Sequence, residues 1–327
     1  PKNLDILFVQ NYYEQTLGIM QLSAVLKQQG FTTDVAIGTE KNVIEAIIRS
    51  RPKALGFYCT TGFHHKNLSV ASQVKKTLGD KILIVFGGPH PTFVPDIIKQ
   101  DGVDIVCRGE GEYAILELMQ LLSQGKDYTK IQSLIVKKDG QIYENEIRPL
   151  CDVDELPFLD REIYRDIDYI YKNKRQQVML ARGCPFDCTF CSSHAFRELY
   201  KGKGNYVRLR SIPKIIEELS MIKKRYNPSC FFFHDETFGL KKDYYQEFLN
   251  TYKRAINLPF SCLVRADLVT EDFIRLLKET GCYFASFGVE SGNEKLRNTL
   301  LKKRVTNDNI LNCAGFLNKY KIPFSTF

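Results

Sequence analysis

The 327-residue sequence contains no apolar run that approaches the ~18 residues of a membrane-spanning helix. Residues 1–5 lack a signal-peptide pattern, and no repeat or low-complexity segment occurs. The 46 Lys and Arg exceed the 38 Asp and Glu by only 8, without the dense basic block typical of a nucleic-acid tail. With 44% hydrophobic and 26% charged residues, the composition excludes disordered and fibrous proteins. We expect a cytoplasmic globular protein with no membrane span and no nucleic-acid partner.

Two phosphate-binding motifs are also missing from the first half of the chain. The loop after the first predicted strand, residues 11–18, contains no G-x-G-x-x-G, and no P-loop occurs, which excludes nicotinamide and nucleoside-triphosphate binding. Short apolar runs alternate with amphipathic helical stretches such as 17–29 and 68–78, which predicts a doubly wound parallel sheet of the Rossmann-like α/β class. The predicted strands are 6–9, 33–37, 54–58, 82–86 and 104–107. Ligands of such sheets bind at the carboxyl ends of the strands.

The length suggests two domains, since one domain has ~150 residues. A hairpin turning at Asp139-Gly140 closes a first domain over 1–150, residues 151–176 form a linker, and a second alternation occupies 177–327. Its five βα periods predict a partial TIM-like barrel. Its predicted strands are 178–181, 230–234, 260–265, 283–289 and 322–327, and its predicted helices are 212–224, 244–256, 271–279 and 307–319, with Ser211 and Thr270 as N-caps. Because the chain stops in the fifth strand, we expect a fragment of a longer protein.

The ten cysteines fall into two groups. An untargeted chain keeps its thiols reduced, so a disulfide framework is not expected. Seven cysteines are scattered, mostly in apolar runs, and are interpreted as small buried hydrophobic residues: Cys59, Cys107, Cys151, Cys230, Cys262, Cys282 and Cys313. The other three, Cys184, Cys188 and Cys191, have the spacing C-x3-C-x2-C and require a chemical explanation.

Two metal sites fit this spacing. Zinc needs four ligands, and His194 could complete a Cys3His site. Alternatively, the three thiolates bind three irons of a [4Fe–4S] cluster and leave the fourth iron open to a reactant. The spacing, the position after a predicted strand and the aromatic Phe190 before the last cysteine favour the cluster.

The segment around these cysteines resembles the signature of radical S-adenosylmethionine (SAM) enzymes. The resemblance implies that the open iron binds SAM and that an electron from a donor such as flavodoxin or ferredoxin cleaves it to a 5′-deoxyadenosyl radical. The cofactor carries the difficult chemistry, and the protein positions and shields it. By the same resemblance, SAM-binding positions are Phe190, Asp235, Glu236, Arg265, Glu290 and Ser291. A helix-start carboxylate is the structural alternative for Asp235 and Glu236, and a rim ion pair with Asp267 is the alternative for Arg265.

The first domain resembles the cobalamin-binding domain that precedes the radical barrel in one large subfamily. Residues 87–93 match its G-G-x-H-x-T loop, and residues 106–112 match its R-G-E-G-E loop. Glycine allows close approach of the backbone to a bulky ligand. The resemblance implies cobalamin contacts at Tyr13, Gln15, Gly18, Thr60, Thr61, Gly87, Gly88, His90, Thr92, Arg108, Gly109, Glu110 and Gly111.

One departure from conventional cobalamin domains concerns the cobalt ligand. Those domains carry D-x-H-x-x-G in the first loop, whereas alignment on Gly18 places Tyr13 at the Asp position and Gln15 at the His position. We therefore predict a cobalt without a histidine ligand, its lower face covered by Gln15 or its neighbours. His64 and His65, like His90, are interpreted as polar groups of other loops.

The function implied by the whole resemblance is methylation of an unactivated carbon of a small-molecule substrate. Two alternatives remain: a non-methylating radical cyclisation, ring contraction or tetrapyrrole oxidation with the same cofactors, and a cobalamin sensor with a structural cluster. Phe231, Phe232 and Phe233 suggest a bulky apolar substrate, although core packing is the preferred explanation for them.

Overall fold

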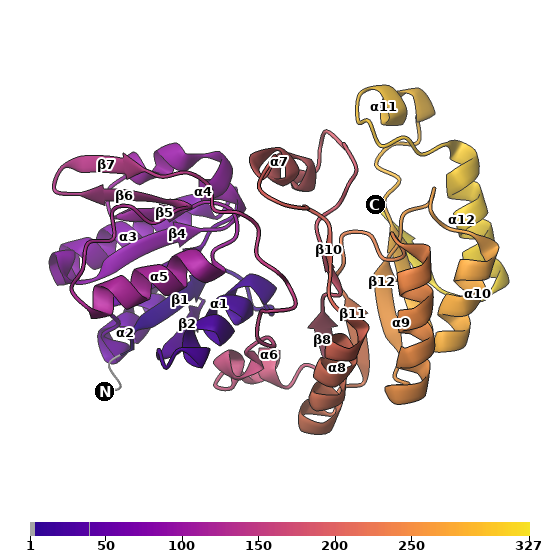
Figure 1. Cartoon of the computed structure of the whole chain (residues 1–327), viewed down its shortest axis with the longest axis horizontal. Coiled ribbons are helices and arrows are strands. Elements are labelled where there is room, and N and C mark those ends of the chain that lie inside the picture. Colours follow the sequence, from indigo (N-terminus) through magenta and orange to yellow (C-terminus); the bar gives the residue numbers. More distant parts are fainter. Residues whose placement is uncertain (1–3, 39) are drawn as a thin grey trace. The chain divides into compact units, whose positions relative to one another are not determined.

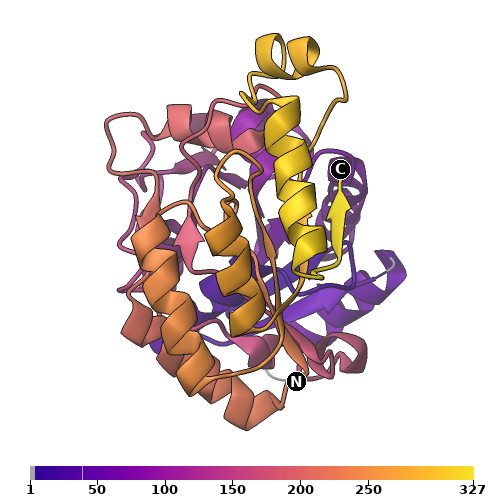
Figure 2. The same ribbon diagram turned by 90° about the vertical axis from the view of Figure 1, so that its right-hand side faces the viewer.

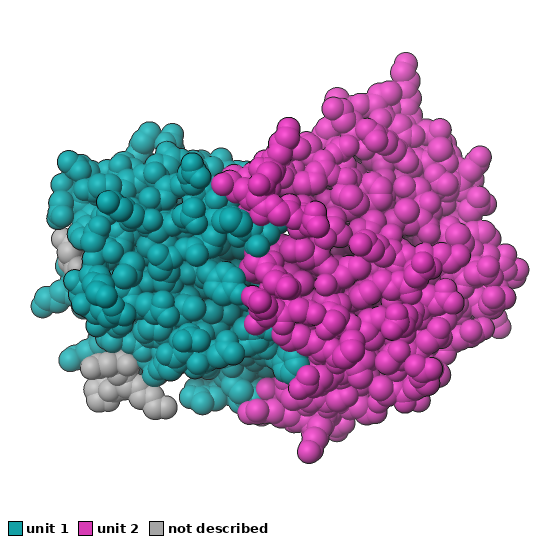
Figure 3. Space-filling view, in the orientation of Figure 1, with its two compact units in different colours: residues 1–150, 156–171 teal, residues 151–155, 172–327 magenta. Residues whose placement is uncertain are grey.

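The computed structural model describes residues 4–38 and 40–327, which form two compact units (Figure 3). Unit 1 comprises Pro1–Leu150 and Leu156–Tyr171, and unit 2 comprises Cys151–Glu155 and Lys172–Phe327. The first three residues, part of the segment inspected for a signal peptide, lie outside the described residues. Within the described part of the chain, no helix has both the length and the hydrophobicity needed to cross a bilayer.

Unit 1 is built on a seven-stranded sheet of order β2-β1-β3-β4-β5-β6-β7. The first five strands in this order are parallel, and β6 and β7 are antiparallel. The strands are β1 Ile6–Gln10, β2 Thr33–Ile37, β3 Ala54–Tyr58, β4 Leu83–Gly87, β5 Ile105–Cys107, β6 Leu134–Lys138 and β7 Gln141–Glu144. The predicted parallel sheet and its hairpin extension are therefore confirmed.

Helices cover both faces of this sheet (Figure 1). α1 and α5 pack on one face and α2 and α3 on the other, because each helix presents an apolar stripe to the buried strands. The helices are α1 Leu17–Gln28, α2 Glu40–Ser50, α3 His64–Leu78, α4 Pro89–Phe93 and α5 Glu112–Ser123, with short 3₁₀ turns η1 Gly79–Lys81 and η2 Pro95–Lys99.

The segment expected to be a linker is divided between the two units. Residues 156–171, with η3 Arg161–Tyr164 and α6 Asp168–Tyr171, pack on unit 1. There Asp160 pairs with Lys27 at 2.6 Å, and Tyr164 is fully buried. Residues 151–155 belong to unit 2, where the Asp154 carboxylate accepts a hydrogen bond from the Ser211 backbone N–H at 2.9 Å. Buried apolar and polar contacts thus order most of this segment.

Unit 2 contains a five-stranded parallel sheet of order β14-β13-β12-β11-β8, in agreement with the predicted partial barrel. Its helices pack in sequence along the outer face, over an aromatic core that includes Phe231 and Phe233. Figure 2 shows α12 beside β14. The strands are β8 Arg175–Val178, β11 Cys230–Phe233, β12 Phe260–Leu263, β13 Cys282–Phe287 and β14 Phe324–Thr326. The helices are α7 Ser192–Leu199, α8 Ile212–Tyr226, α9 Lys242–Ala255, α10 Glu271–Thr280, α11 Glu294–Thr299 and α12 Asn307–Lys319.

The predicted first barrel strand, 178–181, is wrong in its bounds. The barrel strand is β8, and the chain then forms a separate two-residue strand, β9 Ala181–Arg182, antiparallel to β10 Arg208–Leu209. Both predicted N-caps precede their helices, but only the Thr270 hydroxyl accepts a capping bond, from Phe273 N–H at 3.3 Å. Six of the seven scattered cysteines are buried as expected, and Cys230 is partly exposed.

Candidate functional site

The three clustered cysteines lie on the loop between β9 and α7. Cys188 is buried, Cys184 is half-buried and Cys191 is exposed. Desolvation raises the pKa of the Cys184 and Cys191 thiols, and it opposes formation of their free thiolates. At the start of the loop Gly183 has φ +90°, and a Cβ there would lie 2.2 Å from the Tyr206 carbonyl oxygen. Only glycine fits this entry to the loop.

Two acidic residues after β11 hold this loop and the strand before it. Glu236 accepts hydrogen bonds from the Ser193 hydroxyl and the Gly183 N–H, one at each end of the cysteine loop. Asp235 is 1% exposed: Oδ1 accepts from Leu180 N–H at 2.7 Å and from Ala181 N–H at 3.2 Å, and Oδ2 from the Tyr245 hydroxyl at 2.7 Å. Burial raises the pKa of Asp235 to about 6. Asp235 therefore faces the interior, and Glu236 faces the loop.

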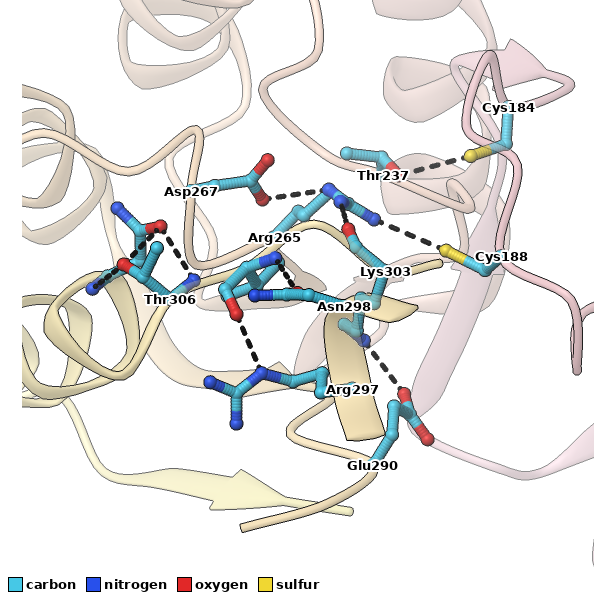
Figure 4. Close-up of polar contacts among 12 residues, drawn as sticks. Cys184, Cys188, Thr237, Arg265, Asp267, Glu290, Arg297, Asn298, Lys303 and Thr306 are labelled. Carbon is cyan, nitrogen blue, oxygen red and sulfur yellow. Dashed lines mark hydrogen bonds and ion pairs between the residues drawn. The ribbon is translucent and has the colours of Figure 1, made fainter. Parts of the chain in front are cut away.

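Arg265 follows β12 and points at the cysteine loop (Figure 4). Its Nη1 donates to Cys188 Sγ at 3.5 Å, and its guanidinium lies 3.7 Å from the centre of the Phe186 ring. Its Nε is 2.7 Å from Asp267 Oδ1, and Nη2 donates to the Lys303 carbonyl. The rim ion pair between Arg265 and Asp267 is thus present, as one part of a larger network.

A second ion pair lies beside the first. Glu290, which follows β13 with φ +63°, accepts from Lys303 Nζ at 2.8 Å. A Cβ at Gly288 would lie 2.1 Å from Glu290 Oε1, so glycine makes room for this pair. Lys303 is 8% exposed, and its ammonium lies 5.7 Å from the Phe190 ring, which is 47% exposed. The Ser291 hydroxyl instead accepts from its local partner, Asn293 N–H, at 3.2 Å.

Residues 300–304, after α11, brace the cysteine loop. Thr189 donates its backbone N–H to the Leu301 carbonyl at 3.0 Å and its hydroxyl to the Leu300 carbonyl at 2.9 Å. The fully buried Arg297 fixes this segment, because it donates to the Val305 and Ser291 carbonyls at 2.7 Å each. Sequence reasoning missed Arg297 and Lys303. The only local signal was a run of basic residues, which is more often solvated.

The zinc alternative relied on His194. Its Nδ1 is 3.8 Å from Asp187 Oδ1 and 3.4 Å from Arg197 Nη2, so the ring lies within an ion-pair network. Across the described residues, no three side chains of His, Cys, Asp or Glu lie close enough together to bind one metal ion. Three cysteines that each bind a different iron do not need to converge on one point.

In unit 1, the predicted residues lie at the carboxyl edge of the sheet. The strand order reverses there between β1 and β3, since β2 lies on one side of this pair and β4 on the other. The loop after β1 is shaped by Gln10, whose amide donates to the Tyr12 and Glu14 carbonyls at 2.7 and 2.8 Å. Tyr13 is 48% exposed, Gln15 is half-buried, and a Cβ at Gly18 would meet open space. Sequence reasoning missed Tyr164, which donates to Gln10 Oε1 at 2.7 Å.

Three histidines gather after β3 and β4. The rings of His64 and His65 are 3.9 Å apart, and those of His64 and His90 are stacked at 4.1 Å. His90 is buried, and its Nδ1 is 3.0 Å from the Thr61 hydroxyl. In the same turn, the Thr60 carbonyl accepts a hydrogen bond from Phe63 N–H at 3.1 Å. Burial, and then the neighbouring His64, lowers the pKa of His90. The neutral form of His90 is therefore favoured.

The two glycine-rich loops are fastened to each other by Thr92. Its hydroxyl donates to the Gly88 carbonyl at 2.8 Å and accepts from Gly109 N–H at 3.0 Å. A Cβ at Gly88, where φ is +104°, would lie 2.9 Å from the Cys59 carbonyl oxygen. Contacts within the protein therefore explain why position 88 requires glycine. The remaining loop positions are Gly87 at the end of β4, and Arg108, Glu110 and Gly111 after β5, with Arg108 paired to Glu144 at 3.1 Å.

Known protein families match two separate parts of the chain. Residues 5–119 match the B12 binding domain, and residues 178–327 match the radical SAM superfamily. The chain belongs to the radical SAM proteins that carry a B12-binding domain.

Curated relatives of this radical SAM protein differ in their named activities. The chain is 29% identical over 293 residues to an uncharacterized methyltransferase, PH0819, of Pyrococcus horikoshii, covering 86% of this chain and 61% of the relative. It is 26% identical over 309 residues to the anaerobic magnesium-protoporphyrin IX monomethyl ester cyclase of Rubrivivax gelatinosus, covering 88% and 54%. The chain thus spans little more than half the length of these relatives.

Two solved structures share the fold. The radical SAM methyltransferase TsrM of Kitasatospora setae has a TM-score of 0.78 at 16% identity, covering 98% of this chain and 67% of TsrM. The cobalamin-dependent radical SAM enzyme OxsB has a TM-score of 0.78 at 17% identity, covering 99% of this chain and 49% of OxsB. At these identities the likeness establishes the fold alone.

The side chains of the radical SAM protein fit the groups that its family implies. Arg265 donates to the sulfur of Cys188, and the Thr237 hydroxyl lies 3.8 Å from the sulfur of Cys184, as suits cluster thiolates. In unit 1, Tyr13 and Phe63 expose 48% and 43% of their surface at the sheet edge. Exposed aromatic rings on the loops at the carboxyl edge of the sheet fit a bulky, partly apolar ligand such as cobalamin.

Proposed function

We propose that the chain is the cofactor-binding part of a cobalamin-dependent radical SAM enzyme that methylates an unactivated carbon. The observation that carries this proposal is the loop of Cys184, Cys188 and Cys191, whose two ends are both bound by Glu236. When bound, a [4Fe–4S] cluster and SAM supply a 5′-deoxyadenosyl radical, and cobalamin supplies a transferable methyl group. The chain's own residues hold and orient these groups.

For SAM, the proposed contacts are the predicted residues that remain near the cysteine loop. Phe190 offers an exposed ring, and the Glu236 carboxylate is suited to an ammonium group. Glu290 and Lys303 offer opposite charges beside Phe190. Asp235 and Arg265 are engaged within the protein, so we propose that they position the loop and the strand before it.

For cobalamin, the proposed site is the edge of unit 1 between the loops after β1 and β3. Tyr13, Phe63, Thr61 and His90 line these loops and the adjacent one. Gln15 remains the proposed residue below cobalt. The solved structures of OxsB and TsrM contain bound cobalamin, which supports the same group here.

Methylation is preferred because the relative PH0819 and TsrM are both named methyltransferases. A non-methylating radical reaction is the second candidate, and the cyclase relative supports it. An electron donor such as flavodoxin or ferredoxin and a small-molecule substrate complete either proposal.

The two candidates differ in products that can be measured without the natural substrate. The anaerobically reconstituted protein is incubated with SAM, hydroxocobalamin and titanium(III) citrate, and the nucleoside products are separated by chromatography. We expect S-adenosylhomocysteine, which reports methyl transfer from SAM, together with 5′-deoxyadenosine. Deoxyadenosine alone would support the non-methylating candidate, and neither product would support a cobalamin sensor.

Matched cysteine variants test the role of the loop. Cys188→Ala should abolish cluster binding and deoxyadenosine formation, because a three-cysteine cluster loses one of its protein ligands. Cys230→Ala, which removes a thiol at the opposite end of the barrel strands, should retain both. Full activity in Cys188→Ala would refute the assignment.

A further inference from the structure

Arg265 is a buried cation that contacts the cysteine loop. It lies two residues beyond β12 and is only 8% exposed, although it carries a permanent charge. A buried guanidinium charge is retained when an opposite charge and polar or aromatic partners surround it. Here these partners are the Asp267 carboxylate, the Lys303 carbonyl and the Phe186 ring.

These three partners leave Nη1 as the remaining nitrogen of the guanidinium. Asp267 occupies the Nε side of the guanidinium, Lys303 accepts from Nη2, and Phe186 covers one face of the plane. Nη1 then points at Cys188 Sγ, at 3.5 Å. Because Phe186 and Cys188 belong to the same loop, a shift of that loop would break both contacts together. The donor is therefore fixed relative to the sulfur.

A hydrogen bond to a cluster sulfur changes the energy of reduction. Reduction adds one negative charge to the cluster and its thiolates, so a nearby fixed cation stabilises the reduced form more than the oxidised form. We propose that Arg265 raises the reduction potential of the cluster by donating to the Cys188 thiolate, with Asp267 moderating the effect through its opposite charge. This inference rests on the proposed function, since it requires the cluster.

The test is a redox titration of the reconstituted protein, without SAM, followed by electron paramagnetic resonance of the reduced cluster. Arg265→Met should lower the equilibrium constant for one-electron reduction by about tenfold, which is 59 mV for a one-electron couple. Arg265→Lys keeps the charge and should shift the potential less. Asp267→Asn should shift it in the opposite direction, toward easier reduction. Arg275→Met removes an exposed arginine charge on α10 and should leave the potential unchanged.

The outcomes separate this inference from the proposed function. A normal wild-type cluster whose potential is the same in Arg265→Met would overturn the role of Arg265 alone. An effect of Arg265→Lys on SAM affinity with no effect on the potential would also overturn it, and would return Arg265 to SAM binding. A wild-type protein without a reducible cluster would overturn both proposals. If Arg265→Met does not fold, the opposite shifts of Arg265→Lys and Asp267→Asn decide the question.

Discussion

Replacement of Asp235 gives a sharp test of how the barrel holds the cysteine loop. Three donors converge on this buried carboxylate: the N–H groups of Leu180 and Ala181, and the Tyr245 hydroxyl. Hydrogen bonds to a charged group contribute about 1.5–3 kcal/mol each. Desolvation of the charge outweighs these bonds, so the pKa of Asp235 rises from 3.8 to about 6, a net cost of about 3 kcal/mol for the ionised form. We expect Asp235→Ala to lower the free energy of unfolding by about 2–5 kcal/mol.

Asp235→Asn separates the charge from the hydrogen bonds. An amide oxygen can accept from Leu180 N–H, and an amide N–H can donate to the Tyr245 oxygen. This variant should therefore be much less destabilised than Asp235→Ala. The free energy of unfolding of this variant should also lack the pH dependence that Asp235 contributes, because an amide does not bind a proton in this pH range.

The sign of that dependence follows from the raised pKa. Between pH 3.8 and about 6 the folded protein binds the Asp235 proton more tightly than the unfolded chain does, so this group favours folding as pH falls and loses that contribution as pH rises through 6. From pH 7.5 to pH 5 the wild type should gain about 1.4 kcal/mol relative to Asp235→Asn.

Urea unfolding of the apoprotein at the two pH values measures both effects. A destabilisation below about 1 kcal/mol in Asp235→Ala would refute the hydrogen-bond account. A difference between wild type and Asp235→Asn that does not change with pH would refute the account of the buried charge.

Three further predictions concern the loops. Gly183→Ala should misplace the cysteine loop and reduce the iron content, because its Cβ would meet Tyr206 at 2.2 Å; Gly202→Ala, at φ +75° with no atom within 4 Å, should show only backbone strain of about 1–2 kcal/mol. Arg297→Met should cost about 3–5 kcal/mol in urea unfolding, since it removes the donors to the buried Val305 carbonyl and the half-buried Ser291 carbonyl, whereas exposed Arg275→Met should change little. The cob(II)alamin form should show no nitrogen superhyperfine splitting from a protein imidazole, and such splitting would disprove the role of Gln15.

The sheet of unit 1 could be predicted because its five parallel strands are buried on both faces and read as continuous apolar runs. The first barrel strand was predicted too far along the chain because β8 contains Gln176 and Gln177, which weaken the apolar pattern of the strand. β9 and β10 have two residues each, which is too short for a periodic pattern.

The candidate site also contains some features that the sequence indicates and others that it does not. The spacing of Cys184, Cys188 and Cys191 is local, so the sequence alone indicates the loop. The inward orientation of Asp235 and the contact between Lys303 and Glu290 depend on packing between distant segments. Tyr164 illustrates the same limit, since it reaches Gln10 from a segment whose composition indicated a linker.

The most direct test of the central claim is the electron paramagnetic resonance spectrum of the dithionite-reduced protein before and after addition of SAM. The account predicts the signal of a reduced [4Fe–4S] cluster in the wild type, a change of that signal when SAM binds the open iron, and loss of the signal in Cys188→Ala. Bound zinc with no such signal, or a cluster signal that SAM leaves unchanged, would contradict it.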